Sequence, residues 1–221
     1  MITDLPAKFF ISGSDTDVGK TLVSAILALG LKANYWKPVQ AGSDPSTDSD
    51  WLKSLGVSKK QIVPEKFKLT HPLSPHRAAE LDGVEISLDD FSLPAITPPA
   101  KHLIVEGAGG LLVPLNKKDL VIDLIVHLNL PLLLVCRSGL GTINHTLLSI
   151  EAIRSRKIRL LGVVMNGMEN PANREAIEHF GQTKVLAQVP VLEDVSNQSL
   201  LNCFKHSFAN SAIASSDRSS N

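Results

Sequence analysis

The segment FISGSDTDVGKTLV contains a candidate phosphate-binding loop. Gly19, Lys20 and Thr21 match the end of the signature G-x-x-x-x-G-K-[ST], but the preceding glycine is Gly13, one residue earlier than the signature requires. In such loops backbone N–H groups bind phosphate oxygens, the lysine supplies charge to the β- and γ-phosphates, and the hydroxyl binds Mg²⁺. Because an apolar run precedes the loop and an amphipathic segment follows it, the sequence predicts a nucleotide site at a strand–helix junction.

A carboxylate suited to a metal ion follows a second apolar run, in LIVEGAGG. Glu106 stands at the end of this predicted strand, and Mg²⁺ in proteins prefers one or two carboxylates together with phosphates and waters. The glycines at 107, 109 and 110 permit a tight turn beside a ligand. The alternative interpretation is an ordinary turn at the end of a strand.

Three further segments carry weaker signals. In WKPVQAG, Lys37 stands at the predicted carboxyl end of a strand, the edge that faces ligands in open α/β sheets, where it would neutralise an anion. In STDSDWL, Asp50 is either a metal ligand or a helix-capping or solvated acid. In SGLGTINH, a glycine-bearing loop enters a helix whose free N–H groups would hold a carboxylate, unless it is a plain cap.

These residues require a frame of alternating strands and helices. The near-continuous apolar runs predict an α/β fold with a mostly parallel central sheet and helices on both faces. Strands are expected at 7–13, 34–39, 101–110, 130–139, 158–167 and 183–190, and helices at 20–32, 120–129, 142–156, 173–181 and 197–208. We expect one domain over 1–206, with an irregular helical excursion over 43–100, and a disordered Ser-rich tail over 207–221.

Composition argues against several classes of protein. Lys and Arg total 22 and so do Asp and Glu, so no basic excess suggests a nucleic-acid partner. The two cysteines, Cys136 and Cys203, indicate free thiols in a reducing compartment. No apolar run approaches the roughly 20 residues of a membrane span, and the N-terminal segment lacks the pattern of a signal peptide. We therefore expect a cytoplasmic protein that binds neither nucleic acid nor membrane.

Seven motifs together resemble the dethiobiotin synthetase family. GSDTDVGKT, KPVQAG, SPH, VEGAGG, GTINHTLLS, VVMNG and VPVLED occur in that family's order and spacing between about residues 8 and 197. Single motifs are shared with other P-loop synthetases, whereas the combination at this length is specific. The resemblance implies a P-loop NTPase-like fold and a homodimer with active sites at the subunit interface. It implies an ATP-dependent cyclo-ligase acting on 7,8-diaminononanoate, CO₂ or bicarbonate, and ATP with Mg²⁺.

The resemblance also assigns roles to individual residues. It implies metal ligation by Thr21, Asp50 and Glu106, and catalysis by Lys37 with Lys20. The implied substrate contacts are Thr16, Lys37, Ala41 and, from the partner subunit, Asn144. The implied nucleotide site comprises Asp17, Val18, Gly19, Lys20, Thr21, Leu22, Asp50, Glu106, Gly107, Ala108, Gly109, Asn166, Gly167, Pro190, Val191, Leu192 and Asn197.

The chain departs from the family pattern at two positions. The family often has Ser or Thr where Ala41 stands, so Gln40, Ser43 or a backbone group would have to supply that contact. Asn197 stands where an acid often contacts the nucleotide sugar. The family's loop does share the one-residue shift and an acid at the place of Asp17. We interpret the enlarged loop as leaving room for a carbamate beside the γ-phosphate, with Asp17 shaping the nucleotide site.

Two other functions compete with this interpretation. A cobyrinate-type amide-forming synthetase carries a glutaminase domain, for which this chain is too short. A switch-type P-loop ATPase carries a signature lysine early in the loop, where this chain has Ser14 and Asp15.

Overall fold

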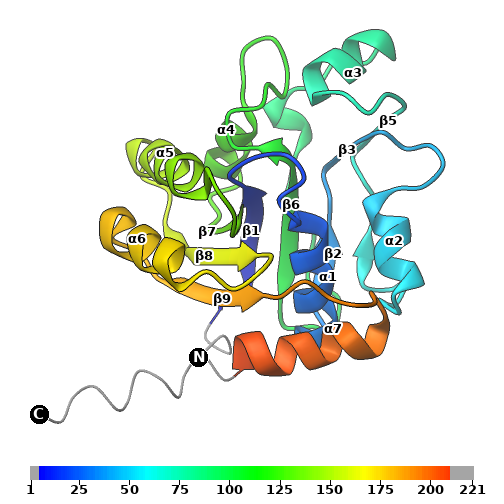
Figure 1. The fold of residues 1–221 in the computed structure, drawn as a ribbon. Coiled ribbons are helices and arrows are strands. Elements are labelled where there is room, and N and C mark those ends of the chain that lie inside the picture. Colours follow the sequence, from blue (N-terminus) through cyan, green and yellow to red (C-terminus); the bar gives the residue numbers. More distant parts are fainter. Residues whose placement is uncertain (1–4, 210–221) are drawn as a thin grey trace, which may run out of the picture.

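A seven-stranded parallel sheet forms the centre of the molecule (Figure 1). The computed structural model describes residues 5–209. The strands of this sheet lie in the order β4-β2-β6-β1-β7-β8-β9, and β3 and β5 pair separately. Their bounds are β1 (Lys8–Gly13), β2 (Asn34–Trp36), β3 (Val39–Ala41), β4 (Ile62–Val63), β5 (Phe67–Leu69), β6 (Leu103–Gly110), β7 (Leu132–Arg137), β8 (Leu160–Asn166) and β9 (Val185–Val189).

Helices cover both faces of the sheet, as the apolar pattern predicted (Figure 1). The α-helices are α1 (Lys20–Leu31), α2 (Asp48–Ser54), α3 (Pro75–Leu81), α4 (Val121–His127), α5 (Thr142–Ser155), α6 (Pro171–Gly181) and α7 (Asn197–Cys203). A 3-10 helix spans Leu88–Asp90 and a π-helix spans Phe204–Ala209. Side chains of α1, α2 and α7 pack on one face, and those of α3, α4, α5 and α6 join the core on the other.

The central strand β1 shows why the strands read as continuous apolar runs. Phe9 and Ile11 point to the face covered by α1, whereas Phe10 points to the face covered by α4 and α5. All three side chains are completely buried. Full burial of an apolar side chain of this size contributes roughly 1.5–3 kcal/mol, so the strand is stabilised from both sides.

The predicted excursion over 43–100 contains more than short helices. It also supplies β4, which extends the central sheet beside β2, and β5, which pairs with β3. The expected strand over 34–39 divides into β2 and β3, and Lys37 lies between them. The excursion is therefore joined to the sheet edge on which the candidate lysine lies.

The C-terminal part of the described chain extends beyond residue 206. The π-helix continues to Ala209, and Phe208 is completely buried in the core on the α1 face. The tail predicted from 207 is thus folded through 209, because Phe208 supplies apolar area to that core. Residues 210–221 of the predicted tail lie outside the described residues. Within residues 5–209, no helix has the length and apolar character needed to cross a membrane.

Candidate functional site

The candidate residues gather at the carboxyl ends of the parallel strands. The loop after β1 carries residues 14–19, Lys37 follows β2, and Glu106 lies within β6. Arg137 ends β7 and Asn166 ends β8, on the same edge. Ligands of open α/β sheets bind at this edge, because the strand-to-helix loops converge there.

The shifted glycine has a steric cause. A Cβ on Gly13 would lie 2.5 Å from the main-chain oxygen of Asp15 and 3.3 Å from Lys20 Nζ, because the loop folds back directly over this position. Lys20 Nζ donates to that same Asp15 oxygen at 3.4 Å. A glycine is therefore required at 13, where it gives the loop room to turn towards the lysine.

The helix that follows the loop also begins at an obligatory glycine. Gly19 has φ +94°, and a Cβ there would collide with the side-chain amide of Asn166. Asn166 Nδ2 donates to the main-chain oxygen of Val18 at 3.0 Å, so the end of β8 holds the last turn of the loop. Asp17 adopts the left-handed conformation, with φ 53°, and is exposed. Leu22 follows in the first turn of α1.

Glu106 is the centre of the site. Its carboxylate is completely buried and accepts three hydrogen bonds, from Thr21 Oγ1 at 3.0 Å, Lys37 Nζ at 3.1 Å and Tyr35 OH at 3.1 Å. Burial alone would raise the pKa of Glu106, but the Lys37 ammonium, together with Ser24 and Lys20, offsets this and the pKa lies below its usual range. The same burial and the negative charge of Glu106 raise the pKa of Tyr35 well above 10, so its phenol stays a donor.

The two lysines are close enough to influence each other. Burial lowers the pKa of Lys20; Glu106 acts in the opposite direction, and the Lys37 ammonium lowers the pKa further. An anion that arrives between these lysines relieves both the loss of hydration and their mutual repulsion. The site is thus electrostatically suited to a polyanion such as a triphosphate.

Lys37 is shared between Glu106 and a second acid, Asp48. The Lys37 ammonium forms an ion pair with Asp48 Oδ2, at the first residue of α2. Gln40 Oε1 accepts from the Asp48 backbone N–H at 3.2 Å and so ties the start of α2 to β3. The acid that the excursion brings to the lysine is therefore Asp48.

The structure gives Asp50, the predicted metal ligand, a different set of partners. It closes a capping box with Thr47, whose hydroxyl accepts from Asp50 N at 3.1 Å while Asp50 Oδ2 accepts from Thr47 N at 3.2 Å. Lys53 donates to Asp50 Oδ1 at 2.9 Å, and these hydrogen bonds lower the pKa of Asp50 to about 2. Asp50 thus caps α2 in the structure, and the acid of α2 that contacts Lys37 is Asp48.

The oxygen atoms around Lys37 suit a magnesium ion. They come from the Thr21 hydroxyl and the carboxylates of Glu106 and Asp48, and hard oxygen ligands are those that Mg²⁺ prefers. Within the described ranges, no group of three or more His, Cys, Asp or Glu side chains forms a metal cage. The donor set fits an ion that takes its remaining ligands from phosphate and water.

The segments predicted to frame the adenine lie beside the loop. Gly167 follows Asn166, has φ 127° and donates its N–H to Val189 O at 2.9 Å. Gln188 Nε2 donates to Gly167 O at 2.9 Å and Val189 pairs with Asn166, so the end of β9, which leads into residues 190–192, lies next to Asn166. Asn197, by contrast, uses its amide to donate to Leu55 O at 2.7 Å, a structural contact between α7 and the end of α2.

The predicted substrate residues are arranged around this edge of the sheet. Ala41 ends β3, and Gln40 Nε2 donates to the carbonyls of Ala41 and Gly42 at 3.2 and 3.0 Å. Both ends of the Gln40 amide are thus used to hold the backbone. Thr16 and Asn144 are exposed, one in the loop and the other in the first turn of α5.

A cavity of about 430 Å³ opens beside the phosphate loop. Its lining residues are Ser14, Asp15, Gly110, Leu111, Leu112, Val113, Pro114, His145, Leu148, Ser149 and Ala152. Asp15 and His145 are its ionisable side chains among the described residues, with Oδ2 and Nδ1 separated by 3.6 Å. Apolar walls with one acid–imidazole pair suit an aliphatic ligand that carries an amine.

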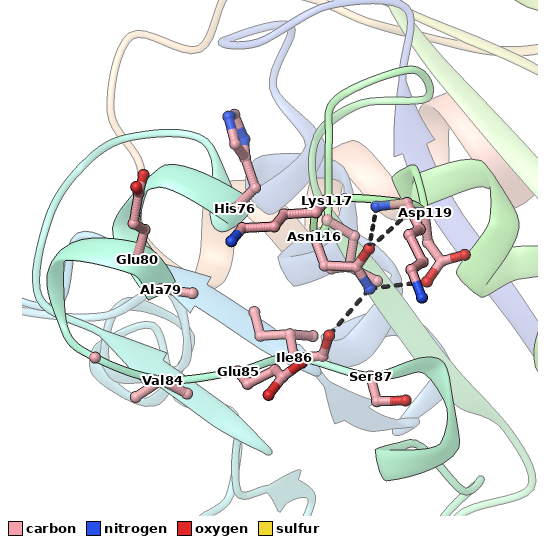
Figure 2. A pocket seen from close by; sticks show the side chains of 13 residues that line it. His76, Ala79, Glu80, Val84, Glu85, Ile86, Ser87, Asn116, Lys117 and Asp119 are labelled. Carbon is pink, nitrogen blue, oxygen red and sulfur yellow. Dashed lines mark hydrogen bonds between the residues drawn. The ribbon is translucent and has the colours of Figure 1, made fainter.

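A second cavity, of about 460 Å³, lies between α3 and the loop 115–119 (Figure 2). Charges of both signs line it, including Glu80, Glu85 and Lys117, which are exposed to solvent. Asn116 shapes its wall by donating to Ile86 O at 3.0 Å and to Asp119 at 2.8 Å. In the described part of the chain, no residue predicted for the site contributes to this lining.

Sequence reasoning overlooked several residues of the site. Thr47 and Asp50 are spaced as the two partners of a capping box, which indicates that Asp50 caps the helix. Asp48 takes no part in this cap, so its carboxylate can contact Lys37. Tyr35 and Lys37 are two positions apart at the end of a strand, so both can approach a neighbouring strand on the same face. The contacts of Asp15 with His145 and of Arg137 Nη2 with Thr16 O, at 3.0 Å, join segments far apart in sequence and leave no local signal.

The sequence is similar to a known protein family and to several named proteins. Residues 7–199 match a family model described as an AAA domain. The chain is 51% identical over 187 residues to the ATP-dependent dethiobiotin synthetase BioD of Paramagnetospirillum magneticum, covering 85% of this chain and 89% of that protein. It is 46% identical over 205 residues to the protein of the same name from Bradyrhizobium diazoefficiens, covering 92% and 96%.

Similarity to solved structures concerns the fold alone. The cell division ATPase MinD of Pyrococcus furiosus aligns with a TM-score of 0.52 at 14% identity, over 90% of this chain and 97% of that chain. Its P-loop architecture confirms the predicted fold class.

A pair of variants separates the two acids of α2. Asp48→Asn should raise the Mg²⁺ concentration needed for half-maximal activity by about tenfold, because a carboxylate beside Lys37 is lost. Asp50→Asn should leave that concentration unchanged and lower the free energy of unfolding by about 1 kcal/mol, since it weakens a cap. Mg²⁺ titration of activity and urea unfolding measure the two effects. A raised Mg²⁺ requirement in Asp50→Asn, with none in Asp48→Asn, would show that Asp50 is the metal ligand, as the resemblance implies.

Proposed function

The chain belongs to the family of the ATP-dependent dethiobiotin synthetases, and from this premise we propose that it closes the ureido ring of dethiobiotin. The substrates are 7,8-diaminononanoate, CO₂ and ATP, and the product belongs to biotin biosynthesis. The observation that carries the proposal is the position of Lys37, between Glu106 and Asp48 and between the phosphate loop and the β3 edge. The cavity lined by Asp15 and His145 opens beside the same loop.

The reaction proceeds by carboxylation, phosphoryl transfer and ring closure. One amine of the diamine attacks CO₂ as its free base, forms a C–N bond and gives up a proton, which leaves a carbamate. A carbamate oxygen attacks the γ-phosphorus and displaces ADP, forming a carbamic–phosphoric anhydride. The second amine attacks the carbonyl carbon, the ring closes and phosphate leaves. No step requires a nucleophile from the protein.

The lysines address the main electrostatic obstacle, because carbamate and γ-phosphate are both anionic. Lys20 and Lys37 screen their repulsion and hold the reacting groups in line. Glu106 and Asp48 fix the Lys37 ammonium from two sides, so it does not need to reorganise as charge develops. We assign Lys37 as the catalytic lysine on this basis and Lys20 as the lysine of the phosphate loop.

Mg²⁺ accompanies ATP in this proposal. Thr21, Glu106 and Asp48 would hold the ion, since these are the oxygen ligands that converge at the site. When bound, Mg²⁺ neutralises charge on the β- and γ-phosphate oxygens.

The diamine is proposed to occupy the cavity beside the loop. Its aliphatic chain would lie against the walls formed by residues 111–114 and 148, and an ammonium would approach Asp15. Leu112 and Leu148, which line this cavity, are exposed, and so is Leu140 in the loop before α5. A second copy of the chain would cover these leucines and bring Asn144 of the partner subunit to the substrate carboxylate, which makes the active species a homodimer.

Product analysis tests the function directly. With ATP, Mg²⁺ and bicarbonate, phosphate release should depend on 7,8-diaminononanoate, and mass analysis should show dethiobiotin. The reaction is matched against the same mixture without the diamine. Steady ATP hydrolysis that ignores the diamine would overturn the proposal in favour of a switch-type ATPase.

A second experiment tests the placement of the diamine. Asp15→Asn should raise KM for the diamine by about three- to tenfold, the effect of one partly exposed ion pair, with the dissociation constant of ATP unchanged. Lys20 contacts the main-chain oxygen of Asp15, which the substitution retains. Ser149→Ala is the matched control in the same cavity, since the Ser149 hydroxyl already donates to His145 O. An equal KM in Asp15→Asn and the unsubstituted protein would exclude this placement.

A further inference from the structure

Tyr35 is the only tyrosine in the chain, and it contacts the central carboxylate of the site. Its side chain is completely buried. The hydroxyl donates to Glu106 Oε2 at 3.1 Å, in a part of the molecule that water does not reach. Burying a hydroxyl in this way costs free energy unless it is hydrogen-bonded. The hydrogen bond to Glu106 offsets that cost.

Strand register brings the two residues together. β2 and β6 are parallel, with Tyr35 opposite Ile104 and Trp36 opposite Val105. Glu106 lies two residues beyond Ile104 and therefore on the same face of the sheet, within reach of a tyrosine side chain that extends along the strand. The ring packs in the core on the α1 face, where phenylalanine would fill the same space. The hydroxyl is thus the part of Tyr35 that packing does not explain.

The two oxygens of Glu106 have separate partners. Thr21 and Lys37 both donate to Oε1, whereas Tyr35 donates to Oε2. A carboxylate bound at one oxygen alone can rotate about its terminal torsion, which is broad in Glu. A donor on the second oxygen removes that freedom and fixes the plane of the group.

We propose that Tyr35 is a positioning residue that locks the Glu106 carboxylate, so that Oε1 faces Thr21, Lys37 and the metal ion. The inference rests on the metal role proposed above for Glu106. It adds a residue on the far side of the carboxylate, which acts through Glu106 and touches neither substrate nor nucleotide. Partners behind a metal ligand set its orientation, and their loss typically costs about 10- to 100-fold in metal affinity or activity.

Tyr35→Phe tests the proposal with little change in packing. The variant is titrated with Mg²⁺ in the presence of saturating ADP by calorimetry, and the binding of ADP without Mg²⁺ is measured separately. We expect the Mg²⁺ dissociation constant to rise about tenfold and ADP affinity without Mg²⁺ to stay unchanged. An unchanged Mg²⁺ dissociation constant would overturn the proposal.

Thr146→Val is the matched control for the loss of a buried hydroxyl. Thr146 is also completely buried, and its hydroxyl contacts Thr142 in α5, away from Glu106. This variant should lower the melting temperature without altering Mg²⁺ binding. An equal loss of Mg²⁺ affinity in both variants would show a general effect of core packing and would contradict a specific role for Tyr35.

The single tyrosine permits a readout that needs neither turnover nor a substitution at Tyr35. Protein produced with 3-fluorotyrosine should give one tyrosine ¹⁹F resonance, which reports on the hydroxyl–carboxylate contact. Addition of Mg²⁺ to the ADP complex should shift this resonance, and Glu106→Gln should abolish the shift. A resonance that ignores Mg²⁺ in the unsubstituted protein would contradict the proposal. Because these measurements require no dethiobiotin formation, failure of the reaction assay and failure of the Tyr35 proposal remain distinguishable.

Discussion

The buried ion pair between Lys37 and Glu106 is the interaction on which the site depends. Removing two charges from water costs several kcal/mol per ion, and the cost is recovered only with good geometry and further hydrogen bonds. Here Thr21, Tyr35 and Asp48 supply the additional contacts. Four elements, α1, β2, β6 and α2, must therefore be in place together. The same constraint that stabilises the pair presents a fixed ammonium at the edge where the phosphate loop ends.

The phosphate loop is adapted to this edge. The fold-back over Gly13 brings the main-chain oxygen of Asp15 to Lys20 and leaves the Asp15 side chain free to face His145. One segment therefore contributes its backbone to the nucleotide side and a carboxylate to the neighbouring cavity. The proposed reaction brings a carbamate to the γ-phosphate, and this turn lies between the phosphate loop and the cavity proposed for the diamine.

Much of this architecture could be predicted from sequence, because it is encoded locally. Apolar runs identified the strands, and the Gly19-Lys20-Thr21 signature identified the loop and the helix after it. Glu106 and Lys37 were placed correctly because strand ends in a parallel sheet share an edge. The position of Asp48 beside Lys37 was not predicted, because it depends on where the short helix α2 begins, which the capping box at Thr47 sets. Tyr35 was missed because its hydroxyl acts across two strands whose register is not visible in either one. Phe208 fell both at the end of the predicted helix 197–208 and inside the predicted tail, and the apolar core on the α1 face shows why it is buried.

The ion pair holds the charge of Lys37 where it acts on the reacting anions, so Lys37 contributes to turnover and not to the affinity for ATP. Lys37→Gln tests it most directly, because glutamine removes the charge of Lys37 and still carries a polar N–H donor. The account predicts an ATP dissociation constant within about tenfold of the original, with turnover reduced by about 100-fold or more, as for other lost transition-state donors. Near-normal turnover in Lys37→Gln, measured beside calorimetric ATP binding, would contradict it.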